Sequence, residues 1–272
     1  MKTIILATDF SKESASASEF AARIARIFKS RLMILHVYKS SPHIPTWTDL
    51  PVSQEDKMKT KIMRRLYRLR KRLAELSENS VEIILSAREG DTIDTIKKVT
   101  EEQHVDLLVM GTAGEKSPGF TYFGSKATEL ILQIEVPLLL VPPKVHFSKF
   151  ESMVLALDMQ HAVNAAAIDN VIRFCKEFGA VLNVVCISDE PSDPKTLETG
   201  HHIRSLMLSI PHTMSIVPGR NATAKIIEFA TENHADLLIM LPKQHNRLLY
   251  SVLESNTQQV ARQAGMPVMA VV

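Results

Sequence analysis

The chain has 272 residues, of which 45% are apolar, and its 32 basic and 30 acidic residues give a net charge of +2. This length suffices for about two globular domains with full cores, and the near-neutral charge points to no particular partner. No stretch has the roughly 18 consecutive apolar residues of a membrane span, so we expect none. The N-terminal sequence MKTIILATDF turns acidic too early for a signal peptide, and we therefore expect a soluble, cytoplasmic protein.

Apolar runs alternate with amphipathic segments along the first half of the chain. The expected strands are Thr3 to Thr8, Arg31 to Tyr38, Val81 to Ser86, Asp106 to Met110 and Pro137 to Val141. The expected helices are Lys12 to Phe28, Glu55 to Glu78, Thr92 to Gln103 and Ser125 to Gln133. Strands separated by helices indicate βαβ crossovers and a parallel sheet covered on both faces. Five such strands predict a doubly wound α/β domain.

The second half of the chain repeats the first. KTIILATDF at Lys2 resembles ESMVLALDM at Glu151, with an offset of 149. Two later matches share an offset of 130: VDLLVMG with ADLLIML, and VPLLLVP with MPVMAVV. The second half is therefore about nineteen residues shorter between its first and fourth strands. Because Pro142 and Pro143 end a strand and stiffen a connection, we predict tandem five-stranded domains at 1–143 and 150–272.

Glycines follow the fourth expected strand. Gly111-Thr112-Ala113-Gly114 comes first, and Gly124-Ser125 follows after nine intervening residues, where Ser125 can cap the next helix. Glycines let the backbone approach a ligand closely, and the amides of a helix N-terminus attract anions. The pattern predicts a site for nucleotide phosphates. The alternative is a loop in which the glycines serve only turns.

An acidic residue, Asp9, follows the first expected strand. In doubly wound sheets the ligand lies beyond the carboxyl ends of the strands, where the strand order reverses. Asp9 and Gly111 would then meet in one crevice, and the carboxylate could accept hydrogen bonds from ribose hydroxyls. The alternative for Asp9 is a helix cap, because Thr8-Asp9-Phe10-Ser11 precedes an expected helix.

These residues resemble a known family. Asp9 after strand one, His36-Val37 at the end of strand two, and Gly111-x2-Gly114-x9-Gly124-Ser125 after strand four together resemble the universal stress protein family. The resemblance covers almost the whole chain and is to the tandem form, in which two Rossmann-like domains of the adenine nucleotide alpha hydrolase-like type are fused. The glycine spacing is that of the ATP-binding branch. Neither a Walker P-loop nor the Rossmann glycine fingerprint is present.

The resemblance implies a nucleotide site in the first half. Asp9 and Gly111 would hold the ribose, and Ala7 and the Val37 backbone would meet the adenine. Gly114, Gly124 and Ser125 would bind the phosphates. Lys126 would either add positive charge there or point to solvent. The implied set is Ala7, Asp9, Val37, Gly111, Gly114, Gly124, Ser125 and Lys126. The implied ligand is ATP, and the resemblance does not distinguish it from AMP or ADP. The nucleotide could bind together with magnesium.

The second half departs from this pattern. The positions equivalent to the three glycines hold Leu241, Gln244 and Glu254, although Asp158 and Ser255 keep their places. Side chains would obstruct the backbone, and a carboxylate would repel phosphates. We expect no ATP binding of this kind there. Lys243, His245 and Arg247 could bind another anion, but a solvated basic loop is favoured.

The family resemblance also implies how the two halves associate. Family members commonly dimerise through the last strand, so Val136 to Val141 and Val268 to Val272 would pair within one chain. The second half would then act as a fixed, dimer-like partner in a pseudo-two-fold arrangement. A further homodimer stays open.

Two segments lie outside the motif that the family resemblance covers. Lys57 to Arg72 carries nine cations around a helically spaced apolar stripe; a solvated face is favoured over binding to nucleic acid or an anionic membrane. Ser40 to Ser53 carries three prolines and Trp47, the only tryptophan; a surface excursion is favoured over a lid or a docking loop.

No motif indicates catalysis. The chain has no nucleophile elbow, no fixed Cys/His constellation and no paired carboxylates, and its ten histidines lack zinc-ligand spacing. Cys175 and Cys186 are too few for a disulfide framework, and we expect reduced, packed thiols. The leading hypothesis is a nucleotide-binding stress-response switch. The alternatives are an interaction module with a vestigial glycine loop, and a slow ATPase or self-phosphorylating enzyme.

Overall fold

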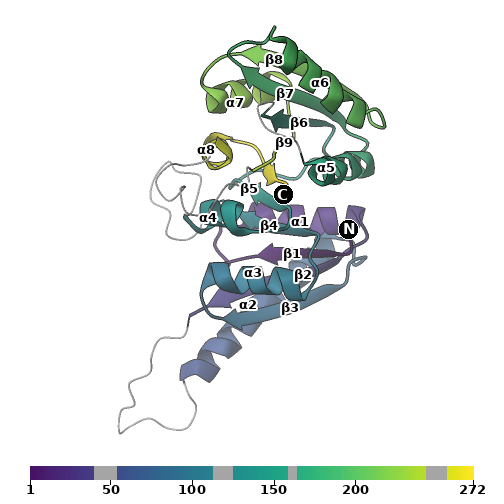
Figure 1. Ribbon diagram of the computed structural model, residues 1–272. Helices are drawn as coiled ribbons and strands as arrows, with labels where there is room; N and C mark the ends of the chain where they lie inside the picture. The colour runs from purple at the N-terminus through teal and green to yellow at the C-terminus, as the bar shows by residue number, and fades with distance from the viewer. Residues whose placement is uncertain (40–53, 113–124, 159–163, 243–255) are drawn as a thin grey trace.

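The computed structural model describes residues 1–39, 54–112, 125–158, 164–242 and 256–272. Strands alternate with helices within each half of the chain (Figure 1). The first half contains β1 (Thr3–Ala7), α1 (Ala15–Ile27), β2 (Arg31–Tyr38), α2 (Gln54–Leu76), β3 (Ile83–Glu89), α3 (Thr92–Glu102), β4 (Leu107–Gly111), α4 (Ser125–Gln133) and β5 (Leu138–Val141). The second half contains β6 (Ser152–Leu157), α5 (Ala165–Phe178), β7 (Val181–Ser188), α6 (Pro194–Leu206), β8 (His212–Pro218), α7 (Ala222–Glu232), β9 (Leu237–Met240), α8 (Asn256–Gln263) and β10 (Val268–Ala270). Among these helices, none is long and apolar enough to cross a membrane.

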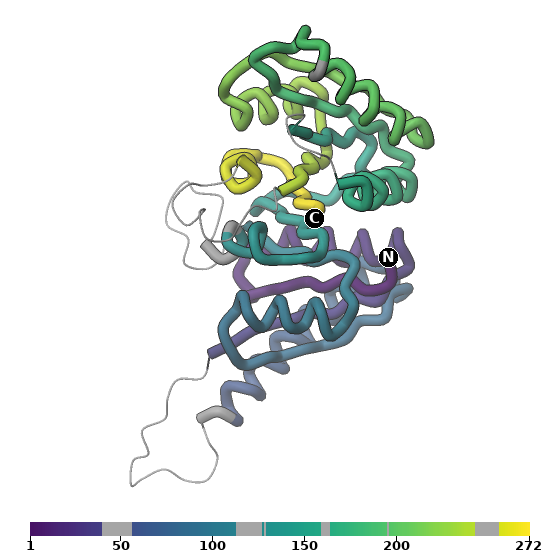
Figure 2. The backbone as a smooth tube through the Cα atoms, viewed as in Figure 1, coloured from purple at the N-terminus to yellow at the C-terminus, as the bar shows by residue number. Residues whose placement is uncertain are grey.

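The strands form one ten-stranded sheet in the order β3-β2-β1-β4-β5-β10-β9-β6-β7-β8. Pairing is parallel within each half, which confirms the predicted α/β class and its doubly wound order. The last strands of the halves, β5 and β10, pair antiparallel, with Leu139 opposite Met269. The two expected five-stranded sheets are therefore one continuous sheet. In the backbone trace the C-terminus lies where the two halves of the chain meet (Figure 2).

Equivalent aspartates immediately precede the fourth strand of each half. Asp106 Oδ2 accepts hydrogen bonds from the amides of Lys2 and Thr3 at 2.6 and 2.9 Å. Asp236 Oδ2 accepts the equivalent pair from the amides of Glu151 and Ser152, at 2.8 and 3.0 Å. A carboxylate that accepts two backbone N–H groups makes strong, charge-assisted bonds. This contact explains why the Asp-Leu-Leu sequence occurs in both copies.

Two apolar layers cover the sheet, and each runs across the junction between the halves. Side chains of α1, α2, α5 and α6 pack on one face, and those of α3, α4, α7 and α8 pack on the other. Phenylalanine rings join the halves on the first face: the Phe28 ring centroid is 5.5 Å from that of Phe174 and 6.0 Å from that of Phe178. Both layers thus bury the paired strands β5 and β10.

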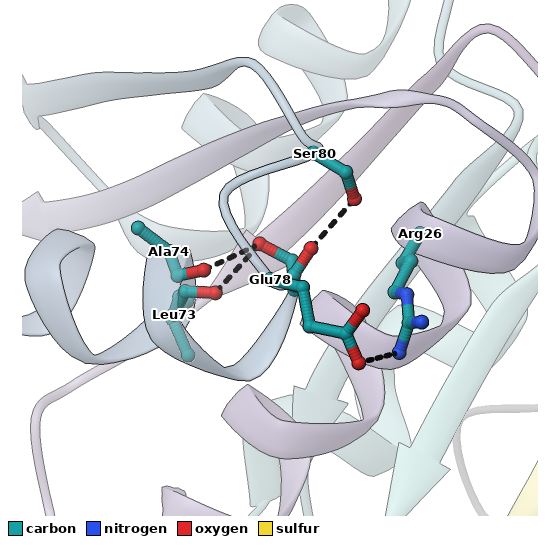
Figure 3. A network of polar contacts seen from close by, with 6 residues as sticks. Arg26, Leu73, Ala74, Glu78 and Ser80 are labelled. Carbon is teal, nitrogen blue, oxygen red and sulfur yellow. Dashed lines mark hydrogen bonds and ion pairs between the residues drawn. The ribbon is translucent and has the colours of Figure 1, made fainter.

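The carboxyl end of α2 is anchored to its neighbours (Figure 3). The buried Ser77 hydroxyl donates to the Leu73 carbonyl at 2.8 Å, and Ser80 Oγ donates to the Ser77 carbonyl at 2.6 Å. Glu78, at a positive φ of 53°, forms an ion pair of 2.6 Å with Arg26 of α1. These contacts stop the helix and hold it against α1.

The segment between β1 and α1 differs from the prediction. Helix α1 begins at Ala15 and not at Lys12, and the residues before it form turns, in which the Ala15 amide donates to the Lys12 carbonyl at 3.2 Å. Thr8 Oγ1 accepts from the Phe10 amide at 3.0 Å, and Ser11 Oγ accepts from the Ser14 amide at 3.2 Å. The result is a hydrogen-bonded turn at the end of β1.

Candidate functional site

The strand order reverses between β1 and β4. From β1 the chain continues outward through β2 and β3, whereas β4 and β5 lie on its other side. At the carboxyl end of this pair, Ala7 is in register with Met110, the residue before Gly111. Ligands of doubly wound sheets bind at such a reversal. The structure therefore brings the ends of β1 and β4 together as the prediction required.

Three of the predicted residues lie on the strands themselves. Ala7 ends β1 and is 8% exposed, whereas Val37 of β2 is half-buried and packs on the same face of the sheet. Gly111 ends β4 and is paired with Val141 of β5. These three positions lie at the carboxyl edge of adjacent strands, where backbone and small side chains can form a wall.

Asp9 lies in the turn that follows β1 and is exposed. Its Oδ1 accepts a hydrogen bond from the Ser11 amide at 2.9 Å. The residue at the N-cap of α1 is Ser14, five positions further on. Asp9 is thus a turn residue at the rim of the sheet, and the alternative that it caps α1 is wrong.

A ring stack holds this turn in place. His36 Nδ1 lies 2.8 Å from the Thr8 carbonyl, and because a carbonyl only accepts, Nδ1 carries the proton. The Phe10 ring, on a residue with φ of 61°, lies 4.5 Å from the His36 ring. Arg65 of α2 places its guanidinium 5.0 Å from the Phe10 centroid. Sequence reasoning missed Phe10 and Arg65, because no motif links a turn to a helix more than fifty residues later.

His36 is the titrating group of this cluster. Burial lowers the pKa of His36, since the charged ring loses solvation, and the positive charge of Arg65 lowers it further. The hydrogen bond to the Thr8 carbonyl and the negative charge of Asp9 raise the pKa, but they do not offset burial. The imidazole is therefore neutral near pH 7.

Thr112 was also missed as a site residue. Its amide donates to the Val141 carbonyl at 3.1 Å, and the residue is 1% exposed. Within the part of the chain that the structure describes, its hydroxyl oxygen has no hydrogen-bond partner. An unsatisfied buried hydroxyl costs about 1–3 kcal/mol. A polar group that binds next to Gly111 would remove this cost.

The phosphate side of the predicted site is described only in part. Gly114 and Gly124 lie outside the described residues. Ser125 is the first residue of α4, and Lys126 is in its first turn. The helix start that the glycine pattern predicted is therefore present, and its first amides have no partner within the helix.

The equivalent position in the second half is occupied by a side chain. Leu241 follows β9 as Gly111 ends β4, and it packs, half-buried, against the core. Asp158 follows β6 and is exposed, as Asp9 is after β1. Gln244, Glu254 and Ser255 lie outside the described residues. The halves thus share an aspartate but differ where the glycine motif begins.

These features define a tandem, doubly wound α/β protein with a candidate site at the strand ends of its first half. Residues 1–142 and 205–272 match the model of the Universal stress protein family. The chain belongs to the universal stress protein family, as its glycine pattern predicted.

Individual relatives agree with this assignment. A universal stress protein of Thermus aquaticus is 30% identical over 143 residues, which are 52% of this chain and 98% of that protein. One of Synechocystis sp. is 20% identical over 299 aligned positions and covers 99% of both chains. The crystal structure of a universal stress protein from Archaeoglobus fulgidus shares the fold, with a TM-score of 0.74 at 17% identity, over 99% of this chain and 95% of that one.

Proposed function

We propose that the chain binds an adenine nucleotide, with ATP as the first ligand to test, in its first half and acts as a nucleotide-dependent switch or scaffold in a stress response. Residues 1–143 would form the binding domain and 150–272 a degenerate partner domain. One observation supports the proposal: Asp9, Gly111 and Thr112 lie at the carboxyl ends of β1 and β4, where the strand order reverses, and among the described residues the buried Thr112 hydroxyl has no hydrogen-bond partner.

The residues present fit the parts of a nucleotide. An exposed carboxylate at Asp9 can accept hydrogen bonds from ribose hydroxyls. Gly111 leaves its backbone open, and the neighbouring Thr112 hydroxyl would gain a partner. The first turn of α4, where Ser125 and Lys126 lie, supplies amides that have no partner within the helix and a partial positive charge for phosphates. Ala7 and Val37 would flank the base.

The second half would not bind in this way, because Leu241 fills the place of the glycine. Its contribution would be structural. The antiparallel pairing of β5 with β10 covers an apolar strand edge that would otherwise be exposed. We propose that this half replaces the second subunit of a dimer, which predicts a monomer in sedimentation equilibrium.

The test is calorimetric titration of the purified protein with ATP, ADP and AMP, each with and without magnesium. One site per chain is expected. Thr112→Val removes the hydroxyl and keeps nearly the same side-chain shape. Asp9→Asn removes the negative charge that would accept hydrogen bonds from the ribose. Each variant should weaken nucleotide binding about tenfold, which corresponds to the loss of one or two hydrogen bonds.

Asp158→Asn is the matched control, since Asp158 has the corresponding place in the second half. It should leave nucleotide affinity unchanged. Two equal sites, or equal losses in Asp9→Asn and Asp158→Asn, would contradict the proposal. A folded protein that binds no nucleotide would favour the interaction module.

A further inference from the structure

One long helix carries a concentrated positive charge. The segment from Lys57 to Arg72 of α2 holds nine of the 32 Lys and Arg residues and none of the 30 Asp and Glu residues. The rest of the chain is consequently net acidic. All nine of these cations are exposed: Lys57, Lys59, Lys61, Arg64, Arg65, Arg68, Arg70, Lys71 and Arg72.

The charge is arranged on one side of the helix. Successive residues of an α-helix are rotated by about 100° around its axis. On this basis seven of the cations lie within an arc of about 120° around α2. The centre of this arc is about 140° around the helix from the buried stripe of Ile62, Leu66 and Leu73. We call this arc the basic face. Its members are Lys57, Lys61, Arg64, Arg65, Arg68, Lys71 and Arg72.

Such an arrangement is unfavourable in isolation. Like charges three or four residues apart on a helix cost about 0.2–0.5 kcal/mol per pair, and the basic face contains a continuous series of such pairs. The helix is held by other contacts: its apolar stripe is buried, and Ser77 and the Arg26–Glu78 ion pair anchor its carboxyl end (Figure 3). A polyanion would relieve the repulsion.

The first turns of α2 project beyond the sheet, on the side away from the second half (Figure 1). The basic face extends over about 22 Å, from Lys57 to Arg72, which matches the rise of about six phosphates along one strand of B-form DNA. Arginine provides much of the charge, and its planar fork binds phosphate oxygens in pairs. The surface is thus long, accessible and matched to a chain of phosphates.

An exposed aromatic ring borders the basic face. Tyr67 is 56% exposed and lies one turn from both Arg64 and Lys71 on the helix. Unstacked bases pack on such rings, and stacking beside a cationic groove is typical of proteins that bind single strands. The apolar side of α2 is used in the core, so this helix has no apolar face to insert into a lipid surface.

We propose that the basic face of α2 binds single-stranded nucleic acid through its phosphates, with a base stacked on Tyr67. The binding is independent of sequence, because Lys and Arg side chains directed at phosphates do not distinguish bases. It uses none of the residues proposed to hold the nucleotide. RNA and DNA share this chemistry.

The experiment measures fluorescence anisotropy of a short mixed-sequence RNA, the matching single-stranded DNA and the duplex, using protein freed of bound nucleic acid. Single strands should bind tighter than the duplex. Affinity should fall with salt at a log–log slope of about −0.7 per phosphate contacted, or about −4 for six contacts. Cosedimentation of the protein with phosphatidylserine vesicles tests the alternative that the basic face binds an anionic membrane.

Charge-reversal variants test whether the nucleic acid binds to the basic face of α2. The triple variant Lys61→Glu, Arg64→Glu, Arg68→Glu should weaken binding at least a hundredfold and flatten the salt dependence. The matched control reverses three exposed lysines elsewhere, Lys2, Lys149 and Lys176, and should lose less than tenfold. Circular dichroism verifies that both proteins keep the wild-type fold.

Two variants isolate the aromatic contact. Tyr67→Ala should lose about tenfold in affinity for single strands, whereas Tyr67→Phe should retain it. The proposal is overturned by equal losses in the two triple variants, by a preference for duplex, or by binding to vesicles without binding to single strands. Loss of nucleotide binding at the other site would leave these outcomes unchanged.

Discussion

The guanidinium of Arg65 lies 5.0 Å from the centroid of the Phe10 ring, which in turn packs at a tilt against the His36 ring. A residue of α2 therefore rests on the turn that carries Asp9. This contact joins the basic face of α2 to the rim of the candidate nucleotide site. It also places charges of opposite sign near one imidazole, which makes His36 a reporter for the turn.

The pKa of His36 should move in opposite directions when its charged neighbours are neutralised. Arg65 lowers this pKa and Asp9 raises it. In Arg65→Gln the pKa should rise toward the ordinary value of 6.5, and in Asp9→Asn it should fall further. Titration of the ring by NMR measures both. Shifts of the same sign in the two variants would contradict the geometry.

Stability should depend on pH through the same residue. Because the pKa of His36 is lower in the folded protein than its ordinary 6.5, the unfolded chain binds the proton more readily. The free energy of unfolding is then highest above pH 6.5 and declines as pH falls through the folded pKa. Urea denaturation across this range should show a smaller decline in His36→Gln. His201→Gln, at an exposed position, is the control and should behave as wild type.

The paired aspartates should contribute equally to the two halves. Asp106→Ala leaves two backbone amides without their acceptor and should lower the free energy of unfolding by about 1–3 kcal/mol. Asp236→Ala should cost a similar amount. The control Glu101→Ala, at an exposed helix position, should stay within about 0.5 kcal/mol of wild type. A cost at only one aspartate would show that the copies are not equivalent.

The junction between the halves should depend on its central strands. Leu139 is fully buried opposite Met269, so Leu139→Ala creates a cavity and should cost about 2–5 kcal/mol in chemical denaturation. Leu208, which is 77% exposed, provides the comparison, and its replacement by alanine should be nearly neutral. Equal effects would mean that the β5–β10 contact is not buried in solution.

Cys175 should be inert in the native protein. Burial raises the pKa of its thiol to about 12, and its Sγ lies 3.5 Å from Met153 Sδ. The reactive thiolate is therefore scarce at pH 8, and iodoacetamide should leave Cys175 unmodified until urea unfolds the chain. Peptide mass analysis after each treatment measures the difference. Rapid native labelling would contradict the buried position.

Several properties were accessible from the residues alone. The alternation of apolar runs with amphipathic segments predicted the parallel sheet, and the repeated Asp-Leu-Leu sequences predicted two copies, since such patterns follow from local periodicity. The glycine spacing indicated the family. Element ends were predicted less well: α1 begins at Ala15 and not at Lys12, and β3 runs to Glu89, three residues beyond the prediction.

By itself the sequence determined the fold class, the duplication and the family, because each depends on neighbours along the chain. Tertiary structure alone decided that Arg65 rests on Phe10, that the hydroxyl of Thr112 is buried without a partner among the described residues, and that Tyr67 is exposed beside the basic face. The physical reason is the same in each case. These contacts join segments whose separation in sequence leaves no local signal, and only the packing of α2 and β4 against the sheet brings them together or leaves them open.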